Sequence, residues 1–455
     1  MRFSDYIPYY KRNLKIAFPV MLTQLGASLV GLFDSMMVGH YATADLAAVS
    51  FSNAIFFTVM VFAMGALMGI TPLVGYEVGH KQISEDLGED KRISSLLLNG
   101  IWFTIVLSVV MVVVLGACIP LLDCFGQEES VVEAARPYYL CIVLSIVPFL
   151  FFCLQKQFLE GMGNTWVAMV ISIFMNGLNI LLNWVFIFGH WGAPAMGATG
   201  AGIATLISRT IMPLLFLGAI VIKREWRLYF RLFKEQTHLF SLRQLKRLWE
   251  TGAPIGSQTV LETVLFTLSF IIVGWLGKEA LAAQQIANQI ADLTFMLALG
   301  IGSATTIRVS HQLGRGDIEA VRMASNASIH LVLLMNTIGA VLMISLRHLI
   351  PYLFTEDTAV IEIASTLILI AGLFQYADGM QAVGAAMLRG ITDVKIPMVY
   401  AFIAYIVIAL PIGLFCMFVL NWGAPGIWIG FIVGLSVAAV LFHARFRKLL
   451  KRMKN

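Results

Sequence analysis

Long apolar stretches separated by short polar segments run through the whole chain. Residues 101–122 read IWFTIVLSVVMVVVLGACIPLL, and residues 329–346 read IHLVLLMNTIGAVLMISL. Each is close to the length of about 20 residues with which an α-helix crosses a hydrocarbon layer of roughly 30 Å. The pattern predicts twelve membrane-spanning helices, over residues 14–39, 46–78, 93–120, 134–159, 165–189, 195–222, 252–276, 280–312, 325–346, 360–388, 395–420 and 424–444.

Composition supports a membrane protein. Of the 455 residues, 59% are hydrophobic and 13% are charged, whereas a soluble domain carries about 25% charged residues. With so few charged residues, a soluble protein of this size could not cover its surface with charged side chains. The first apolar stretch is too long for a signal-peptide core and lacks a small-residue cleavage motif, so we expect it to remain as the first helix. The five cysteines show no metal-binding spacing and are interpreted as packing residues.

The distribution of Lys and Arg predicts which side of the membrane each loop occupies. Twelve spans place both termini and the even-numbered loops on one side. That side holds most of the basic residues, among them Arg2, Lys11, Arg12, Lys15, Lys81, Lys91, Arg92, Lys223 to Arg247, Arg315, Arg322, Lys395 and the tail 445–455. The other side holds Arg136, Lys278 and Arg347. We therefore expect a multi-pass protein of the bacterial inner membrane with both termini in the cytoplasm.

A basic segment divides the chain near its midpoint. Residues 223–250 read KREWRLYFRLFKEQTHLFSLRQLKRLWE. The segment is either an amphipathic surface helix on anionic lipid headgroups or a solvated linker that carries topology signals. It separates a predicted N-terminal lobe, residues 1–222 with spans one to six, from a predicted C-terminal lobe, residues 251–455 with spans seven to twelve.

The two halves of the sequence repeat one another, at an offset of 235 residues over about sixty positions and at slightly smaller offsets later. Pro19 aligns with Pro254, Gly65 aligns with Gly300, and LAA at 46–48 recurs at 281–283. Six spans per half make these parallel repeats, related by a pseudo-twofold axis along the membrane normal. The predicted fold is an all-α membrane protein with two pseudo-symmetric six-helix lobes around a central cavity, an arrangement suited to alternating access. The two prolines either permit bending or fix a static kink.

Three of the carboxylates inside predicted spans are candidate functional groups, because an ionised group there costs roughly 3 kcal/mol on insertion scales. Asp34 lies roughly 8 Å inside the outer end of the first span, Glu262 lies near the middle of the seventh, and Asp378 lies inside the tenth. Each is either a functional group or a protonated side chain at a helix contact. Among the basic residues within spans, Lys156, Arg308 and Arg389 are expected to reach the cytoplasmic face and serve structural roles. Arg209 is deeper and is expected to approach that face.

Amide side chains gather in two spans. Asn176, Asn179 and Asn183 are spaced i, i+3 and i+7 in the fifth span and so share one helical face. They either join helices by hydrogen bonds or supply carbonyl oxygens to a hard cation beside Asp34. Gln284, Gln285 and Asn288 of the eighth span, together with Asn176, are candidates to line the substrate cavity; contacts between helices are the alternative.

Six segments in order resemble the multidrug and toxic compound extrusion (MATE) transporters of the NorM type. They are FDSMMVGH (33–40), EGMGNT (160–165), NGLNILLNWVFIFG (176–189), APIGSQTVLETVLF (253–266), IRVSHQLGRG (307–316) and LFQYADGMQAVGAAMLRG (373–390). The resemblance covers residues 14–444. It implies export of small cationic or amphipathic compounds, coupled to inward Na⁺ or H⁺.

The resemblance also implies two cation sites. Asp34, Asn179, Asn183 and Thr205 would form the site of the N-terminal lobe, and Glu262 and Asp378 the site of the C-terminal lobe. Some relatives carry an aspartate at the position of Asn183, so this chain is expected to bind a cation there more weakly. The DinF-type subfamily lacks the pair in the C-terminal lobe, and its presence here favours the NorM type.

Other functions compete with this interpretation. A lipid-linked saccharide flippase of the same broader superfamily is the main alternative, and it would need arginines lining the cavity. A membrane enzyme would need a metal set or a nucleophile pair, and the eight histidines are scattered, so we expect no catalysis. We expect no cofactor besides Na⁺ as a coupling ion, no nucleic-acid partner, and a monomer in contact with lipid. The sequence leaves the choice between Na⁺ and H⁺ open.

Overall fold

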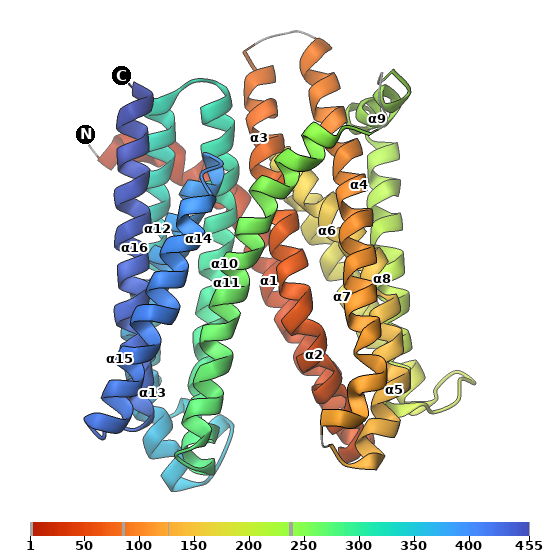
Figure 1. Ribbon diagram of the computed structural model, residues 1–455, viewed down its shortest axis with the longest axis vertical. Coiled ribbons are helices and arrows are strands. Elements are labelled where there is room, and N and C mark those ends of the chain that lie inside the picture. The colour runs from red at the N-terminus through yellow and green to blue at the C-terminus, as the bar shows by residue number, and fades with distance from the viewer. Residues whose placement is uncertain (1–2, 84–86, 126, 236–239, 455) are drawn as a thin grey trace. The chain divides into compact units, whose positions relative to one another are not determined.

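A computed structural model describes residues 3–83, 87–125, 127–235 and 240–454. Helices and their connections make up these residues, with no strand among them. Twelve helical stretches are long and apolar enough to cross a membrane, which confirms the predicted spans (Figure 1). The long helices are α1 (Ile7–Tyr41), α2 (Thr43–Met68), α3 (Ile70–Lys81), α4 (Leu87–Ala117), α5 (Glu129–Leu144), α6 (Ile146–Gly161), α7 (Trp166–Phe188), α8 (Gly197–Ile222), α10 (Leu242–Gly274), α11 (Lys278–Gly314), α12 (Ile318–Leu346), α13 (Thr358–Gly390), α14 (Lys395–Phe402) and α16 (Ala424–Lys454).

Three spans are interrupted. The second breaks at Gly69 between α2 and α3, and the fourth breaks at Ser145 between α5 and α6. The eleventh continues from α14 through a π-helical segment, η5 (Ile403–Ala409), into α15 (Leu410–Leu414) and a second π-helical segment, η6 (Phe415–Val419). Pro411 explains η5, because its ring cannot donate a hydrogen bond and would clash with the carbonyl one turn earlier. A wider turn relieves that clash.

The basic segment between the halves is partly helical. It forms α9 (Arg224–Arg231) and the turn η3 (Leu232–Glu235), and its residues 236–239 lie outside the described residues. Trp226 and Tyr229 of α9 are each 4% exposed and pack into the core formed with α4 and α8. The apolar face of this amphipathic helix therefore lies on protein. Residues 242–250 belong to α10, so a spanning helix begins inside the predicted linker.

The chain divides into two compact units. The unit that we call the N-unit is Leu22–Gly256, and the C-unit consists of Met1–Met21 with Ser257–Asn455. Both boundaries fall within helices, α1 and α10, and they occupy equivalent positions of the internal repeat that pairs Pro19 with Pro254. The lobe boundaries predicted at 222 and 251 therefore differ from those of the units, because each half contributes the beginning of its first helix to the other unit.

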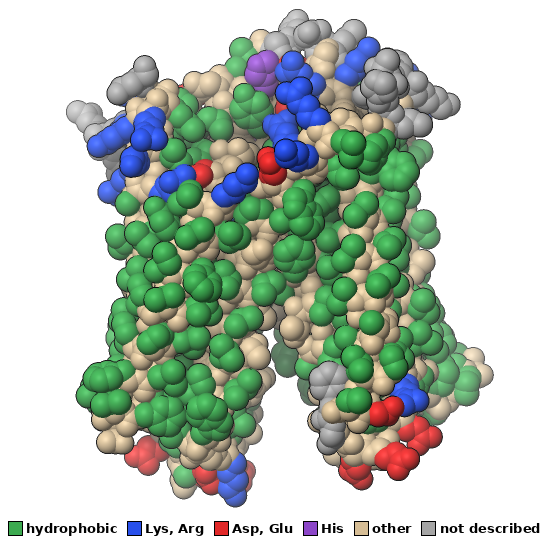
Figure 2. Space-filling model, viewed as in Figure 1, with side chains coloured by type: hydrophobic (Ala, Val, Ile, Leu, Met, Phe, Trp, Pro, Cys, Tyr) green, Lys and Arg blue, Asp and Glu red, His purple; other side chains and the backbone are tan. Residues whose placement is uncertain are grey.

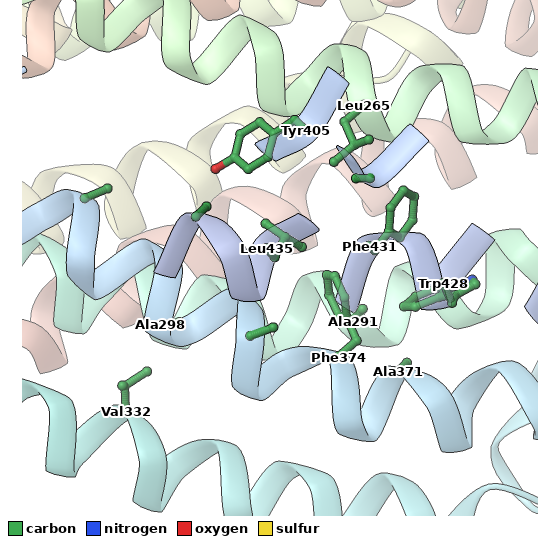
Figure 3. Packing of buried hydrophobic residues seen from close by; sticks show 14 of the residues in the cluster. Leu265, Ala291, Ala298, Val332, Ala371, Phe374, Tyr405, Trp428, Phe431 and Leu435 are labelled. Carbon is green, nitrogen blue, oxygen red and sulfur yellow. The ribbon is translucent and has the colours of Figure 1, made fainter. Parts of the chain in front are cut away.

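In the C-unit, α11 packs on α12 and α13, and α13 packs on α16. Its core holds an aromatic group in which the ring of Phe374 lies 5.2 Å from that of Trp428 and 6.1 Å from that of Phe431 (Figure 3). The beginning of α1 and the end of α16 lie at the same end of this unit (Figure 1).

In the N-unit, α7 packs on α8, and α5 packs on α2 and α8. Close backbone contact joins α10 to the second span: a Cβ atom added at Gly69 would lie 2.9 Å from the Cα of Gly252. The C-unit contains a related contact one turn earlier in the second helix, because a Cβ added at Gly300, the equivalent of Gly65, would lie 3.1 Å from the carbonyl oxygen of Ala17, the equivalent of Gly252. We call α1 and α10 the crossing helices, because each contributes residues to both units. In both units the first half of a crossing helix packs closely against the backbone of another helix.

The surface of each unit carries an apolar band with charged ends. Within each unit, hydrophobic side chains cover the middle, Lys and Arg gather toward one end, and acidic side chains lie at the opposite end (Figure 2). A band of this kind suits the hydrocarbon layer, and a basic end suits the cytoplasmic side of a membrane.

Candidate functional site

The N-unit holds a polar cluster on α1, α7 and α8. Asp34 lies seven residues before the end of α1, or about 10 Å along the axis. Its Oδ1 accepts a hydrogen bond of 2.5 Å from Nδ2 of Asn183, which is completely buried. The same amide lies 3.3 Å from Oδ1 of Asn179, whose own Nδ2 lies 3.3 Å from Oγ of Ser208. The structure therefore brings together Asp34, Asn179 and Asn183, as the resemblance implied.

Two other predicted residues lie at the edge of this cluster. Thr205 is partly buried on α8, and among the described residues the hydroxyl that bonds Asn179 belongs to Ser208, one helical turn later. Ser208 could have been predicted from the sequence, because its i+3 spacing from Thr205 puts both hydroxyls on the same face of the helix. Asn176 is partly buried and faces α1, where a Cβ at Gly26 would lie 3.0 Å from its Nδ2.

Arg209 supplies a positive charge to the N-unit cluster. It lies near the middle of α8, and its Nη1 donates a hydrogen bond of 2.8 Å to Oγ of Ser145. The guanidinium lies 5.1 Å and 4.6 Å from the ring centres of Phe56 and Phe149, and it interacts electrostatically with Asp34. The expectation that Arg209 approaches the cytoplasmic face is wrong, because these contacts hold it in the interior of the unit.

The C-unit holds a second cluster on α10 and α13. Oε1 of Glu262 accepts a hydrogen bond of 3.0 Å from Nε2 of Gln381. Asp378, one turn before Gln381, is 4% exposed and interacts electrostatically with Glu262. The structure therefore brings the two predicted carboxylates together.

Each cluster contains a buried oxygen suited to a cation. Oδ1 of Asp378 and Oδ1 of Asn183 have no hydrogen-bond partner among the described residues. Carboxylate and amide oxygens are ligands for hard cations. The described residues contain no group of three or more His, Cys, Asp or Glu placed to hold a metal ion, so a cation here would need amide oxygens or water as well.

Arg389 and Tyr405 complete the C-unit cluster. Nη2 of Arg389 donates a hydrogen bond of 3.3 Å to Oε1 of Gln258, and the guanidinium interacts electrostatically with Glu262. Arg389 was expected to reach the cytoplasmic face; instead its guanidinium bonds Gln258 and interacts with Glu262. Tyr405 is completely buried on η5, and its hydroxyl points away from the aromatic group (Figure 3).

Asp292 is a carboxylate that the sequence reasoning missed. It lies on α11, fourteen residues after the helix begins, or about 21 Å along the axis. Its side chain is exposed on the C-unit and interacts electrostatically with Asp378. The signal was present, because Asp292 is an acidic residue within a predicted span. The C-unit cluster thus contains three acidic side chains, Asp292, Glu262 and Asp378, beside one arginine.

The candidate cavity residues divide into two kinds. Gln284 is completely buried: its Oε1 accepts a hydrogen bond of 2.7 Å from Nε1 of Trp428, and its Nε2 lies 3.4 Å from Oγ of Ser269. It joins α11 to α10 and α16, so the structure contradicts a cavity-lining role for this residue and supports the alternative of a helix contact. Gln285 is exposed and Asn288 is partly buried.

The flippase alternative depended on arginines. Arg209 and Arg389 are partly buried, but Ser145 and Gln258 respectively bond them, and each interacts with a carboxylate. Such arginines neutralise acidic side chains of the protein itself, and they give no specific support to pyrophosphate binding.

Comparison with known proteins identifies the family. The family model described as MatE matches residues 19–185 and 254–415. The chain is 32% identical over 443 residues to a probable multidrug resistance protein NorM of Xanthomonas axonopodis, covering 96% of this chain and 94% of the relative. It is 33% identical over 445 residues to the multidrug resistance protein NorM of Vibrio cholerae, covering 96% and 95%.

Solved structures agree in fold. An outward-facing multidrug resistance MATE family transporter of the MOP superfamily superposes with a TM-score of 0.86 at 20% identity, covering 98% of this chain and 97% of that one. A MOP superfamily transporter from Pyrococcus furiosus gives 0.87 at 21% identity with the same coverage. At these identities the superpositions show the two-lobe fold alone. The family model and the NorM relatives show the rest: the chain belongs to the MATE family of membrane transporters.

Proposed function

We propose that this protein is a secondary active antiporter that exports small cationic or amphipathic organic compounds, coupled to inward Na⁺ or H⁺, by alternating access. Relatives named multidrug resistance proteins support the substrate class. The observation that carries the coupling is the C-unit cluster, in which Asp378 interacts with two other carboxylates, Glu262 and Asp292, while Arg389 interacts with Glu262. An excess of acidic groups at mid-membrane depth attracts cations and is costly without them.

The balance of charge assigns different tasks to the two clusters. In the N-unit, Asp34 interacts electrostatically with Arg209 and accepts a hydrogen bond from Asn183. One carboxylate there stands against one arginine. In the C-unit the acidic groups outnumber the arginine, so a bound Na⁺ or a proton lowers the electrostatic free energy most there. We therefore place the main coupling site in the C-unit.

Competition for the same carboxylates would exchange the two cargoes. An inward-moving cation neutralises the C-unit cluster and removes its attraction for a cationic substrate, which then leaves on the outer side. Asp292 would serve substrate attraction, because an exposed carboxylate at this depth is stable only where it contacts water. The basic ends of the units would face the cytoplasm of a bacterium, and with them both termini.

Transport in vesicles tests the proposal. The purified protein in proteoliposomes is given a fluorescent cationic substrate and either an imposed Na⁺ gradient or an imposed pH gradient. We expect one gradient to drive export and Glu262→Gln, Asp378→Asn and Asp34→Asn each to reduce it severely. Arg447→Gln, an exposed change on α16, is the control. Near-normal export by all three carboxylate variants would refute the coupling site, and export independent of both gradients would refute antiport.

A further inference from the structure

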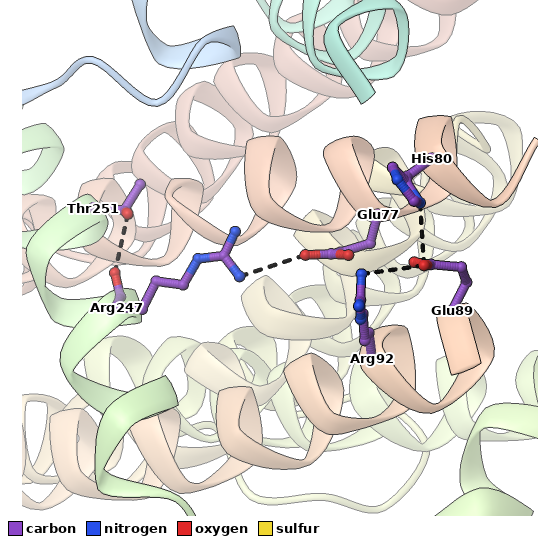
Figure 4. A network of polar contacts seen from close by, with 6 residues as sticks. All are labelled: Glu77, His80, Glu89, Arg92, Arg247 and Thr251. Atoms are coloured by element: carbon purple, nitrogen blue, oxygen red, sulfur yellow. Dashed lines mark hydrogen bonds and ion pairs between the residues drawn. The ribbon is translucent and has the colours of Figure 1, made fainter. Parts of the chain in front are cut away.

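The N-unit contains a set of balanced charges at its basic end. Arg247 of α10 lies 3.4 Å from Glu77 of α3, whose side chain is 7% exposed. Close by, Glu89 pairs with both Arg92 and His80, each at 3.1 Å (Figure 4). The acidic side chains of this network are buried, and each of them has a basic partner.

The repeat-equivalent place in the C-unit has a different charge. In the repeat alignment that pairs Pro19 with Pro254, Arg247 corresponds to Arg12, Glu77 to Gln312, and Leu73 to Arg308. The C-unit therefore keeps the arginine of the crossing helix, lacks the acid that pairs with it, and gains a second arginine.

The alignment is a spatial equivalence as well. Gly252 of the N-unit lies against the backbone of Ala66, and its equivalent in the C-unit, Ala17, lies against Gly300, which is within one residue of the equivalent of Ala66. The same two elements thus meet in the same register in both units, and the charge difference is local to this site.

Arg308 is a buried cation with unused donors. Its side chain is 7% exposed, and its Nε and Nη2 have no hydrogen-bond partner among the described residues. Arg12 and Arg315 lie near enough to repel it electrostatically. Two acidic residues nearby in the sequence are engaged in other contacts: Asp317 caps α12 at 2.8 Å from the amide nitrogen of Ala320, and Glu319 pairs with Arg322 at 2.5 Å.

A buried guanidinium with unused donors is costly unless an anion compensates it. We propose that Arg308, with Arg12 and Arg315, binds a phosphate group at the basic end of the C-unit. Guanidinium donors match the oxygens of a phosphate in geometry and charge. Arg308 lies six residues before the end of α11, about 9 Å along the axis, so it is near the basic end of a spanning helix, where lipid headgroups are accessible. The phosphate therefore belongs to an anionic phospholipid of the leaflet that this end faces. The inference does not depend on the transported substrate.

Lipid titration of the purified full-length protein tests this site. Thermal stability and bound lipid, the latter by native mass spectrometry, are measured with phosphatidylglycerol, phosphatidylcholine or inorganic phosphate added. We expect phosphatidylglycerol to bind and stabilise the wild type, and Arg308→Leu, which installs the residue of the N-unit, to weaken that binding at least tenfold. Arg322→Gln removes a positive charge from the same end and should bind normally. Stabilisation by inorganic phosphate that also depends on Arg308 would keep the phosphate site and assign it to the free anion.

A second variant restores the balance of the N-unit. Gln312→Glu places an acid where Glu77 stands in the other unit, so it should act as an internal partner of the arginines. We expect this variant to be more stable than the wild type without lipid and to lose the stabilisation by phosphatidylglycerol. Arg308→Lys keeps the charge without the planar donors and should bind with intermediate affinity if Arg308→Leu does not fold. Equal binding of phosphatidylglycerol by the wild type and the Arg308 variants would overturn the proposal.

Discussion

Replacing Glu262 with glutamine removes one negative charge from the C-unit cluster and preserves the shape of the side chain. The hydrogen bond of 3.0 Å from Gln381 is retained, because an amide oxygen also accepts. Counted over Glu262, Asp378 and Arg389, two carboxylates and one guanidinium give a net charge of −1 when ionised, and the substitution raises it to zero. The variant therefore tests charge with little change in packing.

The size of the effect follows from Coulomb's law. At an effective dielectric constant of about 20, a unit charge about 4 Å from a bound cation contributes about 4 kcal/mol, which is an upper bound. A third of that bound corresponds to about a tenfold change in affinity. We expect Glu262→Gln to weaken binding of the coupling cation at least tenfold and to abolish gradient-driven export. The free energy of unfolding should change by less than about 1 kcal/mol.

The assay is export from proteoliposomes at a series of Na⁺ concentrations and pH values, with thermal unfolding measured on the same preparations. The companion variant Glu262→Gln with Arg389→Gln returns the counted net charge to −1. It should recover part of the cation affinity if net charge governs binding, whereas continued loss would mean that Glu262 is itself a ligand. A folded Glu262→Gln protein that exports at the wild-type rate under both gradients would refute the reasoning.

Three further predictions concern single side chains. Asp292→Asn should raise the apparent KM for a cationic dye about tenfold and leave that for an uncharged amphipathic compound unchanged; an equal effect on both would contradict a charge role. Gly69→Ala should lower the melting temperature, because its Cβ would lie 2.9 Å from the backbone of Gly252 and overpacking costs about 1–3 kcal/mol, whereas Gly218→Ala, with open space around it, should not. Ser208→Ala removes the hydroxyl near Asn179 and should cost about 1 kcal/mol in thermal unfolding; no change would show that this contact is weak.

Much of the fold could be predicted because the hydropathy of each span and the repeat between the two halves can be recognised directly in the sequence. The twelve spans and the internal repeat were readable from composition and alignment alone. The unit boundaries were not, because hydropathy does not tell which neighbour a helix packs against. The hydropathy of α1 and α10 does not mark a boundary within either helix, yet each helix contributes residues to both units.

The candidate site was predictable in its acidic residues and less so in its basic ones. Asp34, Glu262 and Asp378 were evident as costly charges inside spans, and Asp292 met the same criterion. Arg209, near the middle of α8, and Arg389, near the end of α13, were misinterpreted because a long basic side chain can reach either water or an internal carboxylate. Only the contacts with Ser145 and Gln258 decide between these outcomes.

The crossing helices indicate where alternating access would have to bend the chain. Pro19 and Pro254 each lie two residues before a unit boundary, at Met21 and Gly256. Each proline removes the hydrogen bond to the carbonyl one turn earlier, so each helix is weakened next to the point where it passes from one unit to the other. A proline that only fixed a static kink would not have to lie beside a unit boundary. Here a proline lies beside the boundary in both helices, at the same position of the repeat. If transport proceeds by alternating access as proposed, bending at these prolines allows each crossing helix to keep its close backbone contacts, Ala17 with Gly300 and Gly252 with Gly69.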